Sequence, residues 1–126
     1  MTAKLSLVTT AALIAAGLIH LLPLAGVLGA EKLSALYGIT IAGPDLTILM
    51  RHRALLFGLI GAFCLAAAFH EPLQWAALLM ALASVLAFLA LAWGTGGYNG
   101  AIARVVTADV VAAVLLLAGI AARVWR

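Results

Sequence analysis

Apolar residues fill four long stretches of this chain, at residues 5–28, 46–69, 73–93 and 101–124. An α-helix rises about 1.5 Å per residue, and about 20 apolar residues cross the hydrocarbon core of a bilayer. Each stretch is therefore long enough to span a membrane as one helix. The pattern predicts an all-α fold, an integral membrane antiparallel four-helix bundle that forms one transmembrane domain over residues 1–126.

The first stretch has a second interpretation, because a cleaved signal peptide is also apolar and N-terminal. The apolar part of a signal peptide is only about 7–15 residues long, however. Leu28-Gly29-Ala30 is moreover a poor small-residue cleavage site. We favour a membrane span whose last turns are kinked at Pro23.

Residues 29–44 form the longest connection in the chain. Their portion 31–37 is predicted to be a short interfacial helix, which Gly38 stops. Asp45 follows a Gly-Pro turn and belongs to the residue types that cap helix N-termini. The second long helix is therefore expected to begin near Leu46.

Two short connections, residues 70–72 and 94–100, complete the predicted topology. Connections this short place consecutive helices side by side in opposite directions. The second one is rich in glycine, but it is not a phosphate-binding loop, because the lysine of such loops is missing and no strand precedes it.

The composition supports the membrane interpretation. Of the 126 residues, 67% are hydrophobic and 9% are charged, whereas soluble domains hold about 25% charged residues. The formal net charge of +3 comes from Lys and Arg, mostly near helix ends, which indicates membrane topology and not nucleic-acid binding. Cys64 is the single cysteine, so we predict no internal disulfide and an inert packing role.

Four spans place both termini and the turn at residues 70–72 on one face of the membrane. That face carries Lys4, Arg123 and Arg126, and the opposite connections carry Lys32. In the loops and at the chain ends, the face with the termini thus has three positive charges and the opposite face has one. This difference favours cytoplasmic termini. If the three arginines inside helices are also counted, the face with the termini has three positive charges and the opposite face has four. The inverted orientation therefore stays open.

The polar residues of the predicted spans gather in one half of the bundle, about 5 to 12 Å inside the face that carries the glycine-containing connections. A charged side chain at such a depth costs about 2.5–3.5 kcal/mol on insertion scales, so it should face the other helices and have a partner. Together with two tyrosines of the connections, these residues are the ligand-binding candidates: His20, Tyr37, Arg51, Tyr98, Arg104 and Asp109.

Arg51 is the expected partner of Asp109. It lies seven residues before Gly58, and therefore on the small-residue face that Gly58 and Gly61 give the second long helix. Asp109 lies on the small face of the fourth long helix, which alanines form. We predict that the two charges meet, with Arg104 as the alternative partner of Asp109.

The glycines also predict a close helix–helix contact at Gly58 and Gly61. A leucine at Gly58 should therefore lower thermal stability. A leucine at Gly119, near the end of the fourth helix, is expected to matter less. Equal and negligible effects would mean that the second helix presents this face to lipid.

The predicted Arg–Asp pair has three interpretations. It could fix the register of the helices without any chemistry, belong to a ligand or catalytic site, or lie on an ion or proton path. His20 is expected to be a hydrogen-bonded interhelical residue more often than a ligand or base. His70 and Glu71 are expected to be solvated turn residues. The three histidines lack the spacing of a metal or haem site, so we predict neither a metal nor another cofactor.

Several segments resemble a group of short, four-helix bacterial inner-membrane proteins. They are IHLLPLAGVLG at residues 19–29, ALYG at 35–38, LMRHRALLFG at 49–58, GYN at 97–99 and ARVVTAD at 103–109. Members of that group are sometimes catalogued as phosphopantetheine adenylyltransferase, but that enzyme class requires an HxGH motif on an α/β sheet, which this sequence does not support. The general layout is also similar to that of DoxX-like membrane proteins.

Three functions fit these features. An accessory or scaffold subunit would bind a larger membrane partner, or further copies of itself, through its glycine and alanine faces. A binding protein or enzyme, surrounded by membrane lipid, would hold a lipid-soluble small molecule such as a quinone, sterol or terpenoid in the polar layer. A transporter ranks third, because four helices without a visible inverted repeat are few for alternating access.

Overall fold

The computed structural model describes residues 2–126, which are mainly helical and contain no strand. Four long helices dominate: α1 (Thr2–Leu21), α3 (Pro44–Ala68), α4 (Gln74–Thr95) and α5 (Gly100–Val124). Three short elements complete the chain: the 3-10 helix η1 (Leu22–Leu28), the helix α2 (Ala30–Tyr37) and the 3-10 helix η2 (Glu71–Leu73). The predicted all-α class is confirmed.

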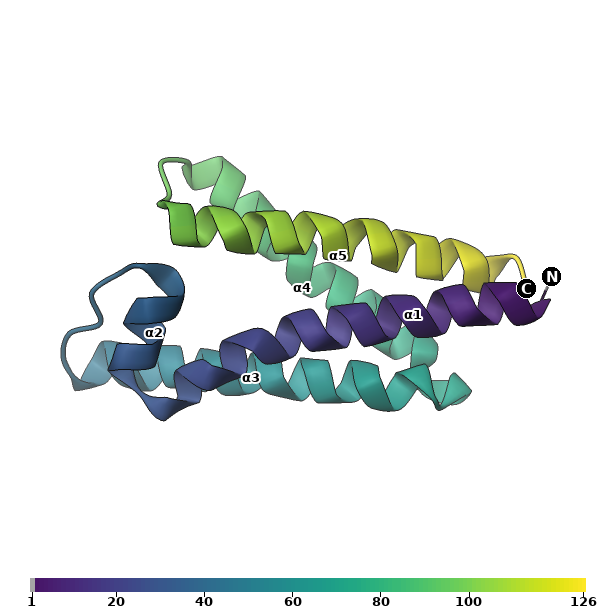
Figure 1. The fold of residues 1–126 in the computed structure, drawn as a ribbon, viewed down its shortest axis with the longest axis horizontal. Coiled ribbons are helices and arrows are strands. Elements are labelled where there is room, and N and C mark those ends of the chain that lie inside the picture. Colours follow the sequence, from purple (N-terminus) through teal and green to yellow (C-terminus); the bar gives the residue numbers. More distant parts are fainter. Residues whose placement is uncertain (1) are drawn as a thin grey trace.

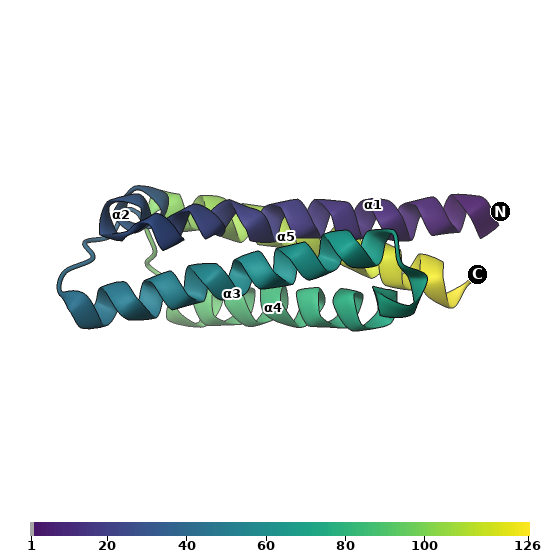
Figure 2. The same cartoon turned by 90° about the horizontal axis from the view of Figure 1, so that it is seen from below.

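The long helices lie alongside one another, with both termini at the same end (Figure 1). α1 packs against α3 and α5, and α4 packs against the same two helices. Over the described residues, α3 and α5 do not contact each other. They therefore lie on a diagonal of a four-sided arrangement, which Figure 2 shows from a second side.

The first apolar stretch is divided into two elements. α1 ends at Leu21, and the chain continues as η1 as far as Leu28. Pro23 has no N–H to donate to an α-helical hydrogen bond, which gives the physical reason for the change. The departure from a regular helix predicted at Pro23 therefore takes the form of a 3-10 helix.

The short helix α2 lies at the end of the molecule away from the termini (Figure 1). Its buried residues Leu33 and Tyr37 pack with Ile41 in a small apolar cluster. Gly38 follows the helix with a positive φ of 63° and donates its N–H to the Ser34 carbonyl. A short helix stopped by Gly38 is therefore confirmed.

The start of α3 corrects a prediction. Gly43 is the N-cap residue, Pro44 is the first helical residue, and Asp45 lies within the first turn. Proline suits the first helical position, because its missing N–H would have no intrahelical partner there. Asp45 is therefore not the cap, although its carboxylate still lies near the positive end of the helix dipole.

Glycines bring α3 close to the first segment of the chain. A Cβ atom on Gly61 would lie 2.7 Å from the carbonyl oxygen of Gly17, so α1 and α3 meet backbone to backbone. A Cβ atom on Gly58 would lie 2.5 Å from a methyl group of Leu24 in η1. The predicted contact at Gly58 and Gly61 is confirmed.

Gly119 lies at a second close contact, between α1 and α5. A Cβ atom there would lie 2.8 Å from the Cβ atom of Ala12. The hydroxyl of Thr9 also donates a hydrogen bond to the Gly119 carbonyl, at 3.1 Å. The end of α5 therefore packs closely against α1, so a leucine at Gly119 would also meet a neighbouring helix, and whether it costs less stability than a leucine at Gly58 stays a prediction.

Candidate functional site

A small cavity lies inside the half of the molecule that is away from the termini. This inner cavity has a volume of about 30 Å³, and α1, η1, α2, α3, α4 and α5 all contribute to its wall. Its lining residues are Ile19, His20, Pro23, Tyr37, Arg53, Phe57, Phe88, Val105 and Asp109. Charged, polar and aromatic side chains from the whole chain therefore converge at one point.

A larger cavity of about 250 Å³ adjoins the inner cavity. This outer cavity shares five residues with it, which are Ile19, Pro23, Tyr37, Val105 and Asp109. Its other lining residues are mostly apolar: Leu22, Leu36, Ala101, Arg104 and Ala108. The polar inner cavity thus continues into an apolar space bounded mainly by η1, α2 and α5.

Arg53 brings the positive charge of the inner cavity. Its Nη1 donates a hydrogen bond to the hydroxyl oxygen of Tyr37, at 2.8 Å. Its guanidinium carbon lies 4.5 Å from the ring centroid of Phe57 and 5.2 Å from that of Tyr37. Phe57 follows Arg53 by one helical turn, so the two side chains share a face of α3. Sequence reasoning missed Arg53, although it lies only two positions after Arg51.

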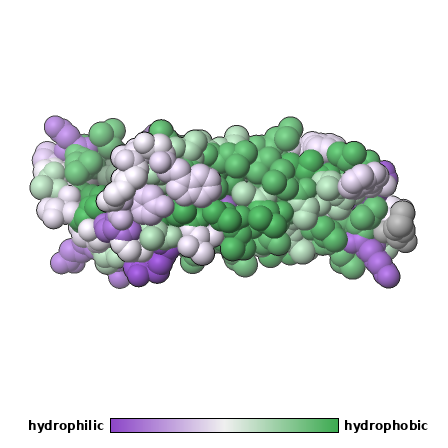
Figure 3. Space-filling view, turned by 90° about the horizontal axis from the view of Figure 1, so that it is seen from above, coloured by the Kyte–Doolittle hydropathy of each residue, from purple (hydrophilic) through white to green (hydrophobic). Residues whose placement is uncertain are grey.

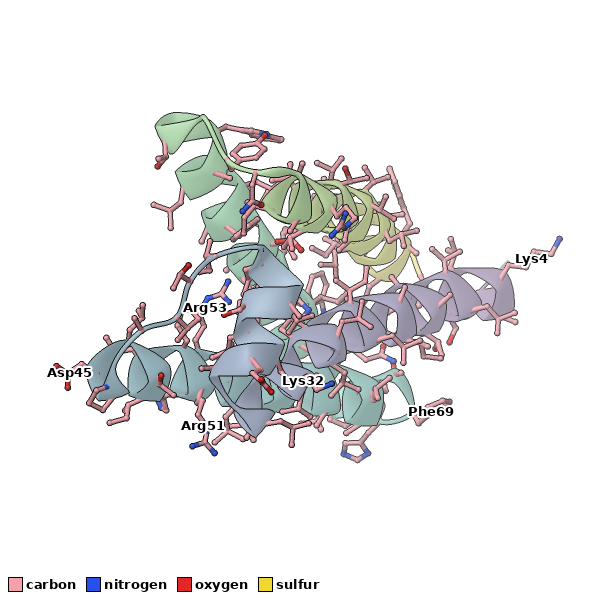
Figure 4. The ribbon with its side chains drawn as sticks, turned by 60° about the vertical axis from the view of Figure 1, so that its left-hand side comes forward. Lys4, Lys32, Asp45, Arg51, Arg53 and Phe69 are labelled. Atoms are coloured by element: carbon pink, nitrogen blue, oxygen red, sulfur yellow. The ribbon has the colours of Figure 1, made fainter. Side chains whose placement is uncertain are left out.

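The predicted contact between Arg51 and Asp109 is wrong. Arg51 is exposed, and its Nε donates a hydrogen bond to the carbonyl oxygen of Val27, at 2.7 Å. It does lie on the same side of α3 as Gly58, but that side packs against α1 and η1, whereas Asp109 belongs to the diagonally opposite α5. Arg53 is about 200° further round the helix and reaches the interior. Figure 4 shows this difference: Arg53 points into the space between α2, α3 and α4, and Arg51 points away from it.

Asp109 lines both the inner and the outer cavity. Among residues 2–126, no hydrogen bond or ion pair joins its carboxylate to another side chain. Arg53 shares the inner cavity with it, and Arg104 shares the outer one, but Arg104 is exposed and is not paired with Asp109 either. The carboxylate therefore faces the cavities with its acceptor oxygens unused by the described part of the chain.

His20 links α1 to α4. Its Nδ1 lies 2.8 Å from the Ala16 carbonyl oxygen, and its Nε2 lies 3.0 Å from the Ser84 hydroxyl oxygen. A carbonyl only accepts, so Nδ1 carries a proton, and in the neutral ring Nε2 accepts from Ser84. The expected interhelical role of His20 is confirmed. Ser84 therefore belongs to the polar layer, which the sequence pattern of α4 does not indicate.

Tyr98 lies apart from the inner cavity. It lines a third cavity of about 360 Å³ near the turn between α4 and α5, which Arg53 also borders. The six candidates are thus divided: the inner cavity has His20, Tyr37 and Asp109, the outer one also has Arg104, and Arg51 and Tyr98 lie elsewhere.

A second polar cluster lies at the end of the molecule that carries the termini. One carboxylate oxygen of Glu71 is 3.4 Å from Nη1 of Arg123 and 3.6 Å from Nη2 of Arg126. The side-chain oxygen of Gln74 accepts a hydrogen bond of 2.8 Å from each arginine. Glu71 is exposed, but it is not merely a solvated turn residue, because it helps to tie the start of α4 to the end of α5.

The remaining titratable residues form no further centre. Residues 2–126 contain no group of three or more His, Cys, Asp or Glu side chains placed to hold a metal ion. Cys64 is buried within the main apolar core, as expected for a packing residue. No family model, no curated protein and no solved structure matches the chain. Function is therefore inferred from the residues and their geometry.

Proposed function

We propose that this chain is an integral membrane protein whose four long helices form an antiparallel bundle in a bacterial inner membrane. Four helical segments are long and apolar enough to cross a membrane: Thr2–Leu28, Pro44–Ala68, Glu71–Thr95 and Gly100–Val124. Large apolar side chains stay exposed along them, among them Leu7, Ile48, Leu91 and Val114. Figure 3 shows an apolar surface through the middle of the molecule and polar residues near its ends. The bacterial inner membrane follows from the resemblance of the sequence segments.

Within this frame, we propose that the two adjoining cavities bind a lipid-soluble small molecule with a polar head. The single observation that carries the proposal is the carboxylate of Asp109, which lies in a helix long and apolar enough to span a membrane and faces the cavities without a side-chain partner among the described residues. Asp109 is partly buried, and a charge without a partner in an apolar environment is destabilising, so a fold that keeps one is typical of a functional position. Arg53 and Tyr37 supply hydrogen-bond donors beside it.

The shape of the cavities supports this ligand class. The outer cavity is lined mainly by apolar residues, such as Leu22, Leu36 and Ala108, and it leads to the polar inner cavity. Ligand sites are mostly apolar with a few placed polar groups, which is the division found here. Quinones, sterols and terpenoids share the corresponding division into an apolar body and an oxygen-bearing head.

The scaffold hypothesis has less support. Its main argument is the set of small-residue faces, but Gly58, Gly61 and Gly119 make their close contacts inside the chain. Those faces are therefore not free to dock a partner helix. An accessory role would have to use another surface of the protein.

Mass spectrometry of the lipid extract of purified protein tests the proposal. We expect a stoichiometric small molecule with the unaltered protein and with Arg51→Gln, a matched arginine variant outside the inner cavity. We expect its loss with Arg53→Gln and with Asp109→Asn. Protein that carries no such molecule in any form, and that retains none when it is supplied, would favour the scaffold hypothesis.

A further inference from the structure

We infer that the polar head of the ligand is an uncharged hydroxyl group attached to an apolar body. This inference rests on the proposed function and specifies the chemistry that the same site would recognise. It is carried by three properties of the site: the volume of the inner cavity, the hydrogen-bonding groups on its wall, and the balance of its charges.

The volume limits the head to about one oxygen atom. The inner cavity measures about 30 Å³, and a cavity needs about 10–15 Å³ to accommodate a single water molecule. A hydroxyl or carbonyl oxygen fits such a space. A phosphate, with four oxygens, or a whole ring does not, so the body of the molecule must stay in the outer cavity of about 250 Å³.

The hydrogen-bonding groups favour a hydroxyl over a carbonyl. Arg53 donates to the oxygen of Tyr37, so the O–H of Tyr37 can itself donate to a ligand. The carboxylate of Asp109, when ionised, only accepts. A hydroxyl head both accepts and donates, and therefore serves both groups. A carbonyl head only accepts hydrogen bonds and would leave the carboxylate of Asp109 without a partner. An unpaired polar group in a binding site lowers the affinity for the ligand.

The charges favour a neutral head. Arg53 and Asp109 line the same small cavity and carry opposite charges. An anionic head would meet the carboxylate of Asp109, and a cationic head would meet the guanidinium of Arg53. A hydroxyl avoids both repulsions, because it carries no charge.

The position of the outer cavity gives such a molecule a route from the bilayer. Its walls are formed mainly by η1, α2 and α5, and Leu22 on its border is 67% exposed. A membrane-dissolved molecule can therefore approach from the side, with its head directed toward Asp109. Within the proposed classes, the site selects the alcohols: a quinol, a sterol alcohol or a terpenoid alcohol, ahead of the corresponding ketones and quinones.

Binding to the protein in lipid nanodiscs tests the inference with three probes of equal chain length: hexadecanol, hexadecyl fluoride and hexadecyl phosphate. Fluorine is close to a hydroxyl in size but cannot donate a hydrogen bond. We expect hexadecanol to bind at least about tenfold more tightly than the fluoride, because it gains hydrogen bonds to charged groups. We expect the phosphate to bind no better than the fluoride.

Two variants assign the preference to the site. Asp109→Leu should abolish the advantage of hexadecanol over the fluoride, and Arg51→Gln should keep it. If the alcohol and the fluoride bind equally to the unaltered protein, or if the phosphate binds best, the hydroxyl inference is wrong while the proposed function stands.

The molecule that co-purifies with the protein gives an independent answer. If it carries a hydroxyl head, the inference is supported. If its head is a carbonyl, a carboxylate or a phosphate, the inference is overturned. If no molecule co-purifies and no probe binds, the proposed function fails together with the inference.

Discussion

Arg53 lies against two aromatic side chains beside the inner cavity, and among the described residues no salt bridge joins it to a carboxylate. Tyr37 accepts a hydrogen bond from it, and the ring of Phe57 lies 4.5 Å from the guanidinium carbon. A cation–π contact of this kind contributes about 2 kcal/mol where water is excluded. No hydrogen bond or ion pair joins Asp109 to Arg53 among the described residues, so the oxygens of Asp109 are left to face a ligand.

Asp109→Asn is consequently expected not to destabilise the empty protein. If the proposed membrane location holds, the substitution removes a charge that costs about 2.5–3.5 kcal/mol on insertion scales, and it breaks no side-chain contact among the described residues. Thermal unfolding of ligand-free protein in detergent should give an unchanged or higher melting temperature.

Asp45→Asn is the matched control, because Asp45 is exposed in the first turn of α3. It should cost about 0.3–1 kcal/mol through the helix dipole. A large loss of stability with Asp109→Asn alone would mean that its carboxylate is paired after all.

The residues of the site could be predicted in part. His20 and Asp109 stand out in the sequence, because polar side chains in an apolar stretch are costly and must face the interior. The choice of Arg51 over Arg53 was wrong for a definite reason. The helical period gives the angle between two residues of α3, but it does not say which neighbouring helix each face will meet. That depends on the arrangement of all the helices, in which α3 lies diagonal to α5.

At the scale of elements, Asn99 connects the two segments that cover the site. Its side-chain oxygen accepts a hydrogen bond of 2.8 Å from the N–H of Ile102 and so caps α5. Its side-chain nitrogen donates to the carbonyl oxygens of Tyr37 and Gly38, at 2.8 and 3.1 Å. One side chain therefore fixes both the start of α5 and the end of α2, and Tyr37 is the residue that α2 contributes to the cavities.

Asn99→Ala and Asn99→Asp should separate these two roles. Aspartate keeps the capping oxygen but loses the amide donor, whereas alanine loses both. We expect the alanine variant to cost about 1–2 kcal/mol. The aspartate variant should keep α5 stable and increase hydrogen exchange in α2 alone. Exchange that rises equally along α2 and α5 in both variants would show that the two contacts do not act separately.

Glycines determine how closely α1 approaches its two neighbours. Gly61→Leu and Gly119→Leu should each lower the free energy of unfolding by at least about 2 kcal/mol, because their side chains would overlap α1. Gly94→Leu is the control, since a Cβ atom at Gly94 meets nothing within 4 Å. Chemical or thermal unfolding in detergent measures the three differences. A Gly119→Leu variant as stable as Gly94→Leu would contradict the contact between α1 and α5.

Most of the elements could be predicted because each long helix coincides with a long apolar stretch of the sequence. The exceptions are local. The change to a 3-10 helix in η1 depends on Pro23 and on packing against α3, and the start of α3 at Pro44 depends on Gly43, which adopts a positive φ of 81°. Sequence patterns identify such residues as breakers or turn formers, but they do not give the conformation that the chain adopts there.

At the scale of the whole molecule, the two ends differ in how their charges are used. The end with the termini carries Lys4 and the paired residues Arg123 and Arg126. The other end carries Lys32 outside the candidate spans, and Arg51 and Arg104 exposed within them, while Arg53 is directed into a cavity. In a membrane protein, charges held in the interior are less able to set the orientation of the chain in the membrane than charges in loops and at chain ends.

We therefore predict cytoplasmic termini, with only a small bias toward that orientation. Reporter fusions after Arg126 and within residues 96–99 should give opposite signals, the first cytoplasmic and the second periplasmic. Because the bias rests on few charges, Lys4→Gln combined with Arg126→Gln should invert a measurable fraction of the molecules.

Arg53→Gln is the control, and it should leave the orientation unchanged because the guanidinium of Arg53 faces the inner cavity. If Arg53→Gln shifts the signals as much as the double variant does, Arg53 contributes to topology during insertion. If the unaltered protein reports a periplasmic C-terminus, the orientation is inverted, and the site then lies in the cytoplasmic half of the membrane.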